Sequence, residues 1–185
     1  MERCPWAQSG NQLMQDYHDE EWGKPLYGDQ QLFRLLSLEL MQAGLSWQTV
    51  LNKRNHFNHS FENFSIYKVS QFDEDKIAEL MENADIIRNK QKIIAIIANA
   101  QAIIRMNQDG QSFDSFLWEF VANKPINNLW RHAEDVPAET DISKKLSKEL
   151  KKLGFKFVGP KIIYSLMQSM GMVDDHITLC KFKTK

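Results

Sequence analysis

The sequence predicts an all-α protein. Apolar side chains recur at helical spacing in one segment after another, and Ser, Asp or Asn precedes several of these segments, where a helix cap is expected. No segment combines sustained period-two alternation with a hairpin turn. The 185 residues, 43% of them hydrophobic, suit one domain with an ordinary core, so residues 1–185 are expected to form a single unit.

The first long helix is predicted from Asp29, which precedes a leucine-rich run at helical spacing, to about Gly44. Ser46 is expected to cap the next helix, which presents Trp47. The longest helix is predicted over residues 89–107, and its isoleucines make it a candidate for the centre of the core. Further helices are predicted to begin at Ser65, within residues 70–73, at Ser112, at Asp141 and at Pro160, with a loop over residues 122–139.

A short turn, residues 154–159, joins the last two predicted helices. Gly154 permits a left-handed close of the first helix, Gly159 permits close backbone approach, and Pro160 suits the first turn of the second. Seven lysines lie in or beside this hairpin, against two acidic residues between positions 141 and 161. The lysines are Lys144, Lys145, Lys148, Lys151, Lys152, Lys156 and Lys161. The pattern indicates either a hairpin that holds DNA phosphate or a solvated lysine face on an ordinary turn.

Overall charge and composition exclude several classes of protein. The net charge is −1, so any nucleic-acid surface must be local. The N-terminus lacks the pattern of a signal peptide, and the most apolar stretch, residues 93–104, is too short to span a membrane. Two cysteines do not suggest a secreted disulfide scaffold, so a cytoplasmic protein is expected, with a monomer as the default.

The two cysteines lie near opposite ends of the chain, each with a histidine in reach. Cys4 is followed by His18, and His176 precedes Cys180 at the i, i+4 spacing of a helix. Two thiolates and two imidazoles form a common set for structural zinc, which would join the two ends of the chain and leave no position for a catalytic water. The alternatives are a Cys4–Cys180 disulfide or two unrelated thiols.

Aromatic residues are dense in the first 47 positions, which hold Trp6, Tyr17, Trp22 and Trp47. Glu39 falls among leucines in the first long helix, where a carboxylate must be paired, protonated or functional. Aromatic faces with one carboxylate describe a receptor for a flat, cationic ligand that donates hydrogen bonds. The alternative is that the aromatic residues belong to the core and Glu39 to the solvent side of its helix.

These stretches together resemble the DNA-3-methyladenine glycosylase I family of the helix-hairpin-helix superfamily. The matches are Arg3-Cys4-x-Trp6, Tyr17-His18-Asp19-x-Glu21-Trp22-Gly23, Leu38-Glu39, Gln42-Ala43-Gly44-Leu45-Ser46-Trp47, Ile86-Ile87-Arg88-Asn89, Phe155-Lys156-Phe157-Val158-Gly159, and Asp175-His176 with Cys180. They extend along nearly the whole chain in the order of the family.

The resemblance implies a bilobal helical fold with one cleft and a structural zinc that joins the termini through Cys4, His18, His176 and Cys180. It implies a monofunctional enzyme that acts on double-stranded, alkylated DNA and releases free 3-methyladenine by hydrolysis. Glu39, the candidate catalytic residue, and Tyr17 would hydrogen-bond the extruded base, and Trp47 would stack on it. Trp6 and Trp22 would form pocket walls. The expected DNA contacts are Gln42, Gly44, Leu45, Lys156, Gly159 and Lys161.

The chain departs from the family pattern at a few positions. Leu40 and Met41 follow the glutamate where Gly-Gln or Gly-Ala is usual, Asp85 stands where Gly is usual, and Asp174 replaces Asn. Leu40 and Met41 adjoin the pocket helix, which leaves open a related glycosylase with another base preference. A zinc-containing DNA-binding module without catalysis is a second alternative, against which the intact Tyr17, Glu39 and Trp47 argue.

Overall fold

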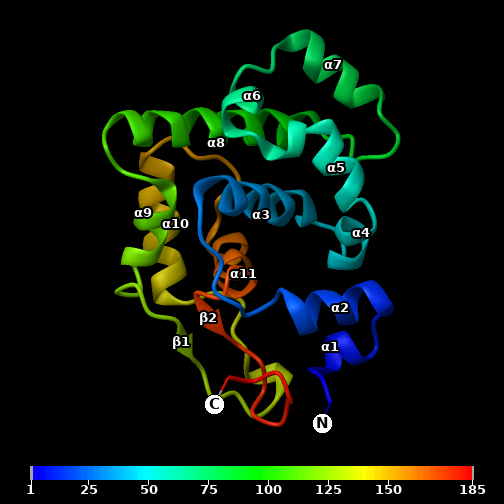
Figure 1. The fold of residues 1–185 in the computed structure, drawn as a ribbon, viewed down its shortest axis with the longest axis vertical. Coiled ribbons are helices and arrows are strands. Elements are labelled where there is room, and N and C mark those ends of the chain that lie inside the picture. The colour runs from blue at the N-terminus through cyan, green and yellow to red at the C-terminus, as the bar shows by residue number, and fades with distance from the viewer. Residues whose placement is uncertain (1, 185) are drawn as a thin grey trace.

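The computed structural model describes residues 2–184 and is built mainly of helices (Figure 1). In chain order they are α1 (Pro5–Gln8), α2 (Gln12–Glu20), α3 (Asp29–Gln42), α4 (Trp47–Asn52), α5 (Arg54–Ser60), α6 (Ile66–Ser70), α7 (Glu74–Glu82), α8 (Lys90–Gln108), α9 (Phe113–Glu119), α10 (Asp141–Lys152) and α11 (Pro160–Ser169). Two 3₁₀ turns, η1 (Glu62–Phe64) and η2 (Ala133–Asp135), and two short strands, β1 (Ile126–Asn127) and β2 (Val173–Asp174), complete the described elements.

Most helix starts lie where the sequence predicts them. The Ser46 side chain accepts a hydrogen bond from the Thr49 amide, and Ser65, Asp73, Asn89 and Ser112 cap their helices in the same way. Two predicted caps are off by one residue. Asp29 and Asp141 are the first residues of α3 and α10, and Gly28 and Thr140 occupy the cap positions.

Helix α8 crosses the molecule and organises the core (Figure 1). Helices α6 and α7 pack on it from one side and α3 from the other, while α11 packs on α3 and α10 on α11. Most of its isoleucines are buried as predicted, although Ile94 is 42% exposed. This arrangement places α3, which carries Glu39, between α8 and α11.

The sequence did not predict several local features. Strands β1 and β2 pair in parallel, with Ile126 opposite Val173, so part of the expected loop 122–139 is tied to the segment before His176. Helices α1, α2 and α5 are also present. The prediction that His176 and Cys180 lie on one helix is wrong. Residues 175–177 follow β2 without helical structure, and residues 178–179 form a turn.

Both ends of the described chain lie in the same part of the fold (Figure 1). Within residues 2–184, none of the helices is long and apolar enough to cross a bilayer.

Candidate functional site

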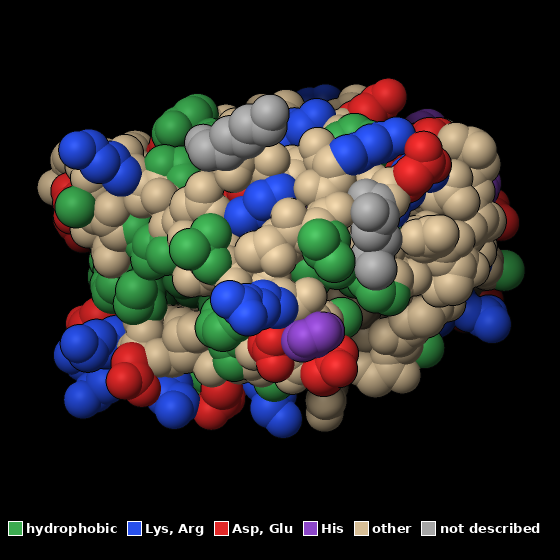
Figure 2. Space-filling view, turned by 90° about the horizontal axis from the view of Figure 1, so that it is seen from below, with side chains coloured by type: hydrophobic (Ala, Val, Ile, Leu, Met, Phe, Trp, Pro, Cys, Tyr) green, Lys and Arg blue, Asp and Glu red, His purple; other side chains and the backbone are tan. Residues whose placement is uncertain are grey.

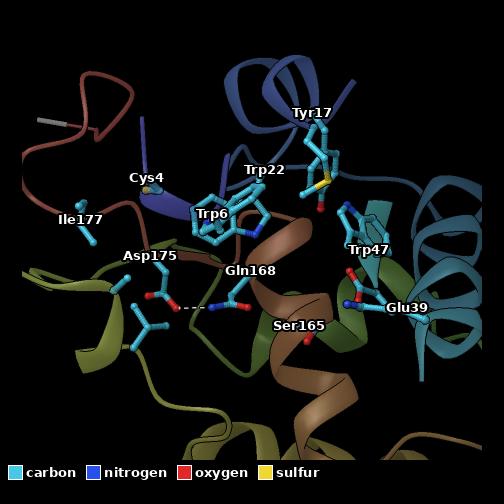
Figure 3. Close-up of a pocket in the computed structure, with 14 residues that line it drawn as sticks. Cys4, Trp6, Tyr17, Trp22, Glu39, Trp47, Ser165, Gln168, Asp175 and Ile177 are labelled. Carbon is cyan, nitrogen blue, oxygen red and sulfur yellow. Dashed lines mark hydrogen bonds between the residues drawn. The ribbon is translucent and has the colours of Figure 1, made fainter. Parts of the chain in front are cut away.

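A pocket of about 410 Å³ opens between α2, the ends of α3 and α4, α11 and the segment after β2 (Figure 3). All five residues predicted to contact a base lie on its wall. The lining consists of Cys4, Trp6, Met14, Tyr17, Trp22, Glu39, Gln42, Trp47, Ala133, Val136, Ser165, Gln168, Asp175 and Ile177.

The aromatic walls of the pocket come from four separate stretches of chain. Trp6 meets Trp22 edge to face, with centroids 5.1 Å apart, and Tyr17 lies 5.2 Å from Trp47. Trp47 is the first residue of α4, and Ser46 fixes that helix start by accepting a hydrogen bond from the Thr49 amide. Its buried Nε1 has no hydrogen-bond partner among the described residues, so one donor remains free at the pocket.

Glu39 is 4% exposed, and its carboxylate lies below Trp47 in Figure 3. Burial raises its pKa to about 8, and the nearby Ser169 hydroxyl lowers it only in part. That hydroxyl donates to the carbonyl oxygens of Ser165 and Leu166, so it is not committed to Glu39. A cationic neighbour would favour the ionised form of this carboxyl group. Burial, and then the charge of Glu39, raises the pKa of the Tyr17 phenol as well.

Asp175 forms the opposite wall and is a polar centre that the sequence did not indicate. Its buried carboxylate accepts hydrogen bonds from four side chains, at distances of 2.6–2.8 Å. The donors are Asn128 Nδ2, Trp130 Nε1, Tyr164 Oη and Gln168 Nε2. The bond to Gln168, dashed in Figure 3, fixes one further side chain at the pocket. The only sequence signal was a carboxylate next to a candidate ligand, His176.

A second recess of about 220 Å³ adjoins the pocket and shares Glu39, Gln42 and Ser165 with it. Gly44, Leu45 and Lys161 also line it, so four of the six predicted DNA contacts meet here. The turn after α3 needs glycine, because Gly44 has φ +81°. Leu45, which follows, is 44% exposed and projects from the scaffold.

The remaining two predicted DNA contacts, Lys156 and Gly159, lie in the hairpin turn between α10 and α11 and line neither recess. Gly154 closes α10 with φ +91°, as the sequence indicates. Buried Asn99 of α8 holds the turn from behind: its Oδ1 accepts from the Lys156 amide at 2.7 Å, and its Nδ2 donates to the Lys156 carbonyl. The Lys156 side chain is left exposed.

Beside the pocket, Cys4, His18 and Cys180 form a buried cluster whose ligand atoms all lie within 4.8 Å of one another. Both cysteines are free thiols, which excludes the disulfide alternative in this structure. Burial raises the pKa of Cys4 to about 12 and lowers that of His18. His176 is not in the 4.8 Å set, but its ring centroid lies 4.7 Å from that of His18.

Each of the two histidines is oriented by a carboxylate. The Nδ1 of His18 lies 2.8 Å from Asp19, and the Nδ1 of His176 lies 2.8 Å from Asp174. Each ring therefore directs its Nε2 away from the carboxylate, the arrangement typical of histidines that bind metals. The Nε2 of His18 lies 3.3 Å from the Cys4 amide nitrogen and 3.6 Å from the Cys180 Sγ. The buried Nε2 of His176 has no partner within residues 2–184. Gly23 makes room for this ring, since a Cβ there would lie 2.8 Å from its Cε1.

Comparisons with known proteins agree along the whole chain. The methyladenine glycosylase family model matches residues 6–184. The chain is 46% identical over 183 residues to the DNA-3-methyladenine glycosylase of Haemophilus influenzae, covering 98% of each chain. It is 45% identical over 180 residues to DNA-3-methyladenine glycosylase 1 of Escherichia coli, covering 97% and 96%. A solved complex of a 3-methyladenine DNA glycosylase I variant with 3-methyladenine superposes with a TM-score of 0.95 at 37% identity, covering 100% and 99%.

Proposed function

Because this chain belongs to the methyladenine glycosylase family, we propose that it is a monofunctional DNA glycosylase. Its reaction is hydrolysis of the N-glycosidic bond of 3-methyladenine in double-stranded, alkylated DNA, the first step of base excision repair. The observation that carries the proposal is the pocket, in which aromatic faces surround one buried carboxylate. Tyr17, Glu39 and Trp47 argue against a module that only binds DNA.

The pocket suits a flat cationic base taken out of the stack. Methylation at N3 gives the adenine of the nucleotide a positive charge. The face of Trp47 attracts that charge by roughly 0.5–2 kcal/mol. The Glu39 carboxylate accepts hydrogen bonds from the base edge, and these bonds are stronger because the acceptor is charged. A solved relative at 37% identity binds 3-methyladenine itself.

Cleavage of the glycosidic bond needs little further catalysis, because the methylated base is already a good leaving group. The bond between C1′ of the sugar and N9 breaks, and its electron pair neutralises the charged ring, which leaves as free 3-methyladenine. Water bonds to C1′ and gives up a proton, leaving an abasic site. Glu39 and Tyr17 hold the ring as its charge changes, with Trp6 and Trp22 as walls. Unmethylated adenine is neutral, so it binds less well and leaves less readily.

The monofunctional assignment rests on the pocket wall, which includes no lysine among the described residues. Lys161 lies in the adjoining recess, where we assign it to a phosphate instead. Borohydride trapping on abasic DNA tests this assignment: no covalent complex is expected. A trapped complex that is lost in Lys161→Ala would show lyase chemistry and contradict it.

DNA would be held at two places in this proposal. Gln42, Gly44 and Leu45 would enter the duplex beside the pocket and fill the space left by the extruded base. Lys156, Gly159 and Lys161 would meet the phosphate backbone at the hairpin, where lysine side chains and the start of α11 face outward. The two lobes around this cleft would form one glycosylase domain over residues 1–185.

Cys4, His18, His176 and Cys180 would hold one structural Zn²⁺ per chain. Two buried thiols, two histidines with tethered Nδ1 atoms and the unpartnered Nε2 of His176 support this set. The metal would stabilise the thiolates that burial disfavours and would join α1 and α2 to the C-terminal segment. Figure 2 shows the face near the two ends of the described chain, where acidic and basic side chains are interspersed. With both thiols reduced, we expect a monomer that works in the cytoplasm.

The direct test is release of free 3-methyladenine from DNA treated with a methylating agent. Release of this base is expected, while release of other bases alone would indicate a different preference. Leu40 and Met41 are wholly buried and line neither the pocket nor the adjoining recess. We therefore expect these departures to leave base preference unchanged. Binding of DNA without release of any base would support the non-catalytic alternative.

A further inference from the structure

Lys92 is a buried cation in the first turns of α8, and its side chain is directed at another helix. The residue is 6% exposed, and no carboxylate of the described chain lies within ion-pair distance of it. Its Nζ donates to the carbonyl oxygens of Met41, at 2.9 Å, and Ala43, at 2.6 Å. These carbonyls belong to the last turn of α3 and the residue after it.

This placement carries a free-energy cost that the fold must offset. Burial lowers the pKa of Lys92, as it does for an ammonium group without a carboxylate partner. The lysine also lies near the start of α8, where the helix dipole disfavours a positive charge. The opposite holds at the end of α3, where unpaired carbonyls present partial negative charge. The two hydrogen bonds to α3 are therefore what makes the position tolerable.

The carbonyls that Lys92 holds flank the turn that projects beside the pocket. Glu39 and Gln42 lie just before the turn, and Gly44 and Leu45 form its exposed part. Apart from Lys92, the backbone of this turn is closed by two short local bonds, Ala43 to Leu40 and Leu45 to Gln42. The start of α8 is itself fixed, because Asn89 accepts from the Lys92 amide. Lys92 thus connects the projecting turn to the central helix.

We propose that Lys92 is a positioning residue for base extrusion, which holds the turn 42–45 at the angle needed to enter a duplex. It acts through the backbone of that turn and touches neither the base nor the sugar. This role rests on the proposed function, in which Leu45 fills the space left by the extruded base. It predicts that Lys92 matters for opening a duplex and matters little for holding a base that is already free.

The test compares Lys92→Met, which keeps the length and loses the charge and donors, with the parent protein. Excision of 3-methyladenine from methylated duplex DNA should fall by about 10-fold to 100-fold, the scale of a misplacement of about 1 Å. Excision from single-stranded DNA methylated in the same way, and affinity for free 3-methyladenine, should change by less than about threefold, since neither requires a duplex to be opened. Leu45→Ala should show the same split. The double variant should lose no more duplex excision activity than the more impaired of the two single variants.

Lys53→Met is the matched control. Lys53 also donates to two carbonyls, those of Ala84 and Asp85, but in the loop before α8. It should leave the ratio of duplex to single-strand excision unchanged. If Lys92→Met does not fold, Lys92→Gln, which keeps an uncharged donor group, should show the same split with a smaller loss.

Three results would overturn the proposal: duplex excision equal to the parent, a parallel loss in all three assays, or losses that multiply in the double variant. Failure of the proposed function is distinct, because the parent itself would then release no 3-methyladenine from either DNA.

Discussion

In the cluster at the chain ends, Asp174 and Asp19 are each held by strong donors, whereas Glu39 in the adjoining pocket has near it the Ser169 hydroxyl, which also donates to backbone carbonyl oxygens. Asp174 accepts from His176 and Thr184, and despite burial these bonds hold its pKa well below the usual range. Asp19 is paired with Arg3 and His18. Glu39 has no such committed donor, and burial raises its pKa to about 8. A carboxylate with its donors in place stabilises the fold, whereas we propose that the Glu39 carboxylate serves a ligand instead.

The largest expected effect comes from removing the proposed zinc from the cluster at the chain ends. Freshly prepared, reduced protein should contain about one zinc per chain, and Cys180→Ser should lose it. The free energy of unfolding should fall by several kcal/mol, which is a drop of roughly 10 °C or more in melting temperature. Metal analysis with thermal unfolding measures both. Leu179→Ser, at an exposed neighbour, should change neither. If reduced protein contained no zinc, the proposal that this cluster holds a structural metal would be contradicted.

Stability should depend on pH through Glu39. Its pKa in the folded protein, about 8, is above the value of about 4.5 expected in the unfolded chain, so the folded state retains a proton that the unfolded state loses. The contribution of Glu39 is thus fully present below about pH 4.5 and is lost as the pH rises through about 8. Glu39→Gln should therefore be more stable than the parent at pH 8, by up to a few kcal/mol.

Urea unfolding of Glu39→Gln and parent at pH 5 and pH 8 measures this difference. Exposed Glu20→Gln on α2 is the control and should follow the parent at both values. A variant no more stable than the parent at pH 8 would show that Glu39 has a committed partner after all.

Trp47→Ala probes the aromatic half of the pocket. Loss of the stacking face should weaken binding of free 3-methyladenine by about 1–3 kcal/mol, with zinc content unchanged. Calorimetry measures the affinity, and Tyr27→Ala, which removes an exposed ring stacked on Trp118, is the control. Unchanged affinity in Trp47→Ala would remove this ring from the proposed site.

The smallest effect is expected at the hairpin lysines. Replacing Lys156 and Lys161 with Ala should weaken binding to damaged and undamaged DNA alike and reduce the salt slope of affinity by roughly 0.9 per lost phosphate contact. Lys68 and Lys76, each paired with a glutamate elsewhere, provide a control double variant that should retain the slope. An unchanged slope in Lys156→Ala/Lys161→Ala would make the hairpin merely structural.

Local signals in the sequence account for the parts of the fold that could be predicted. Caps such as Ser46 and Asn89 accept hydrogen bonds from amides three residues away, so a few neighbouring residues are enough to predict a helix start. Strands β1 and β2 could not be found in this way, because each has two residues and exists only through pairing across the fold. His176 and Cys180 follow β2, so their positions also depend on this pairing and not on the helix that their spacing suggested.

The candidate site divides in a similar way. The placement of Glu39 and the four aromatic residues on one pocket wall could be predicted, because a carboxylate among leucines and a density of rings are visible in the sequence. Asp175 and Lys92 could not, since their roles depend on partners from other elements, Tyr164 and Met41 among them. An aspartate or lysine with ordinary neighbours in sequence gives no sign of such contacts.

The most direct test of the central claim is a titration of free 3-methyladenine into the parent and Glu39→Gln, followed by tryptophan fluorescence at neutral pH. The variant keeps the shape of the side chain and replaces one acceptor oxygen with a donor. It should bind at least tenfold more weakly, a cost of about 1.4 kcal/mol or more, while its fold and zinc content match the parent. Equal affinity in the two proteins would place Glu39 in the scaffold and contradict the assignment of the pocket.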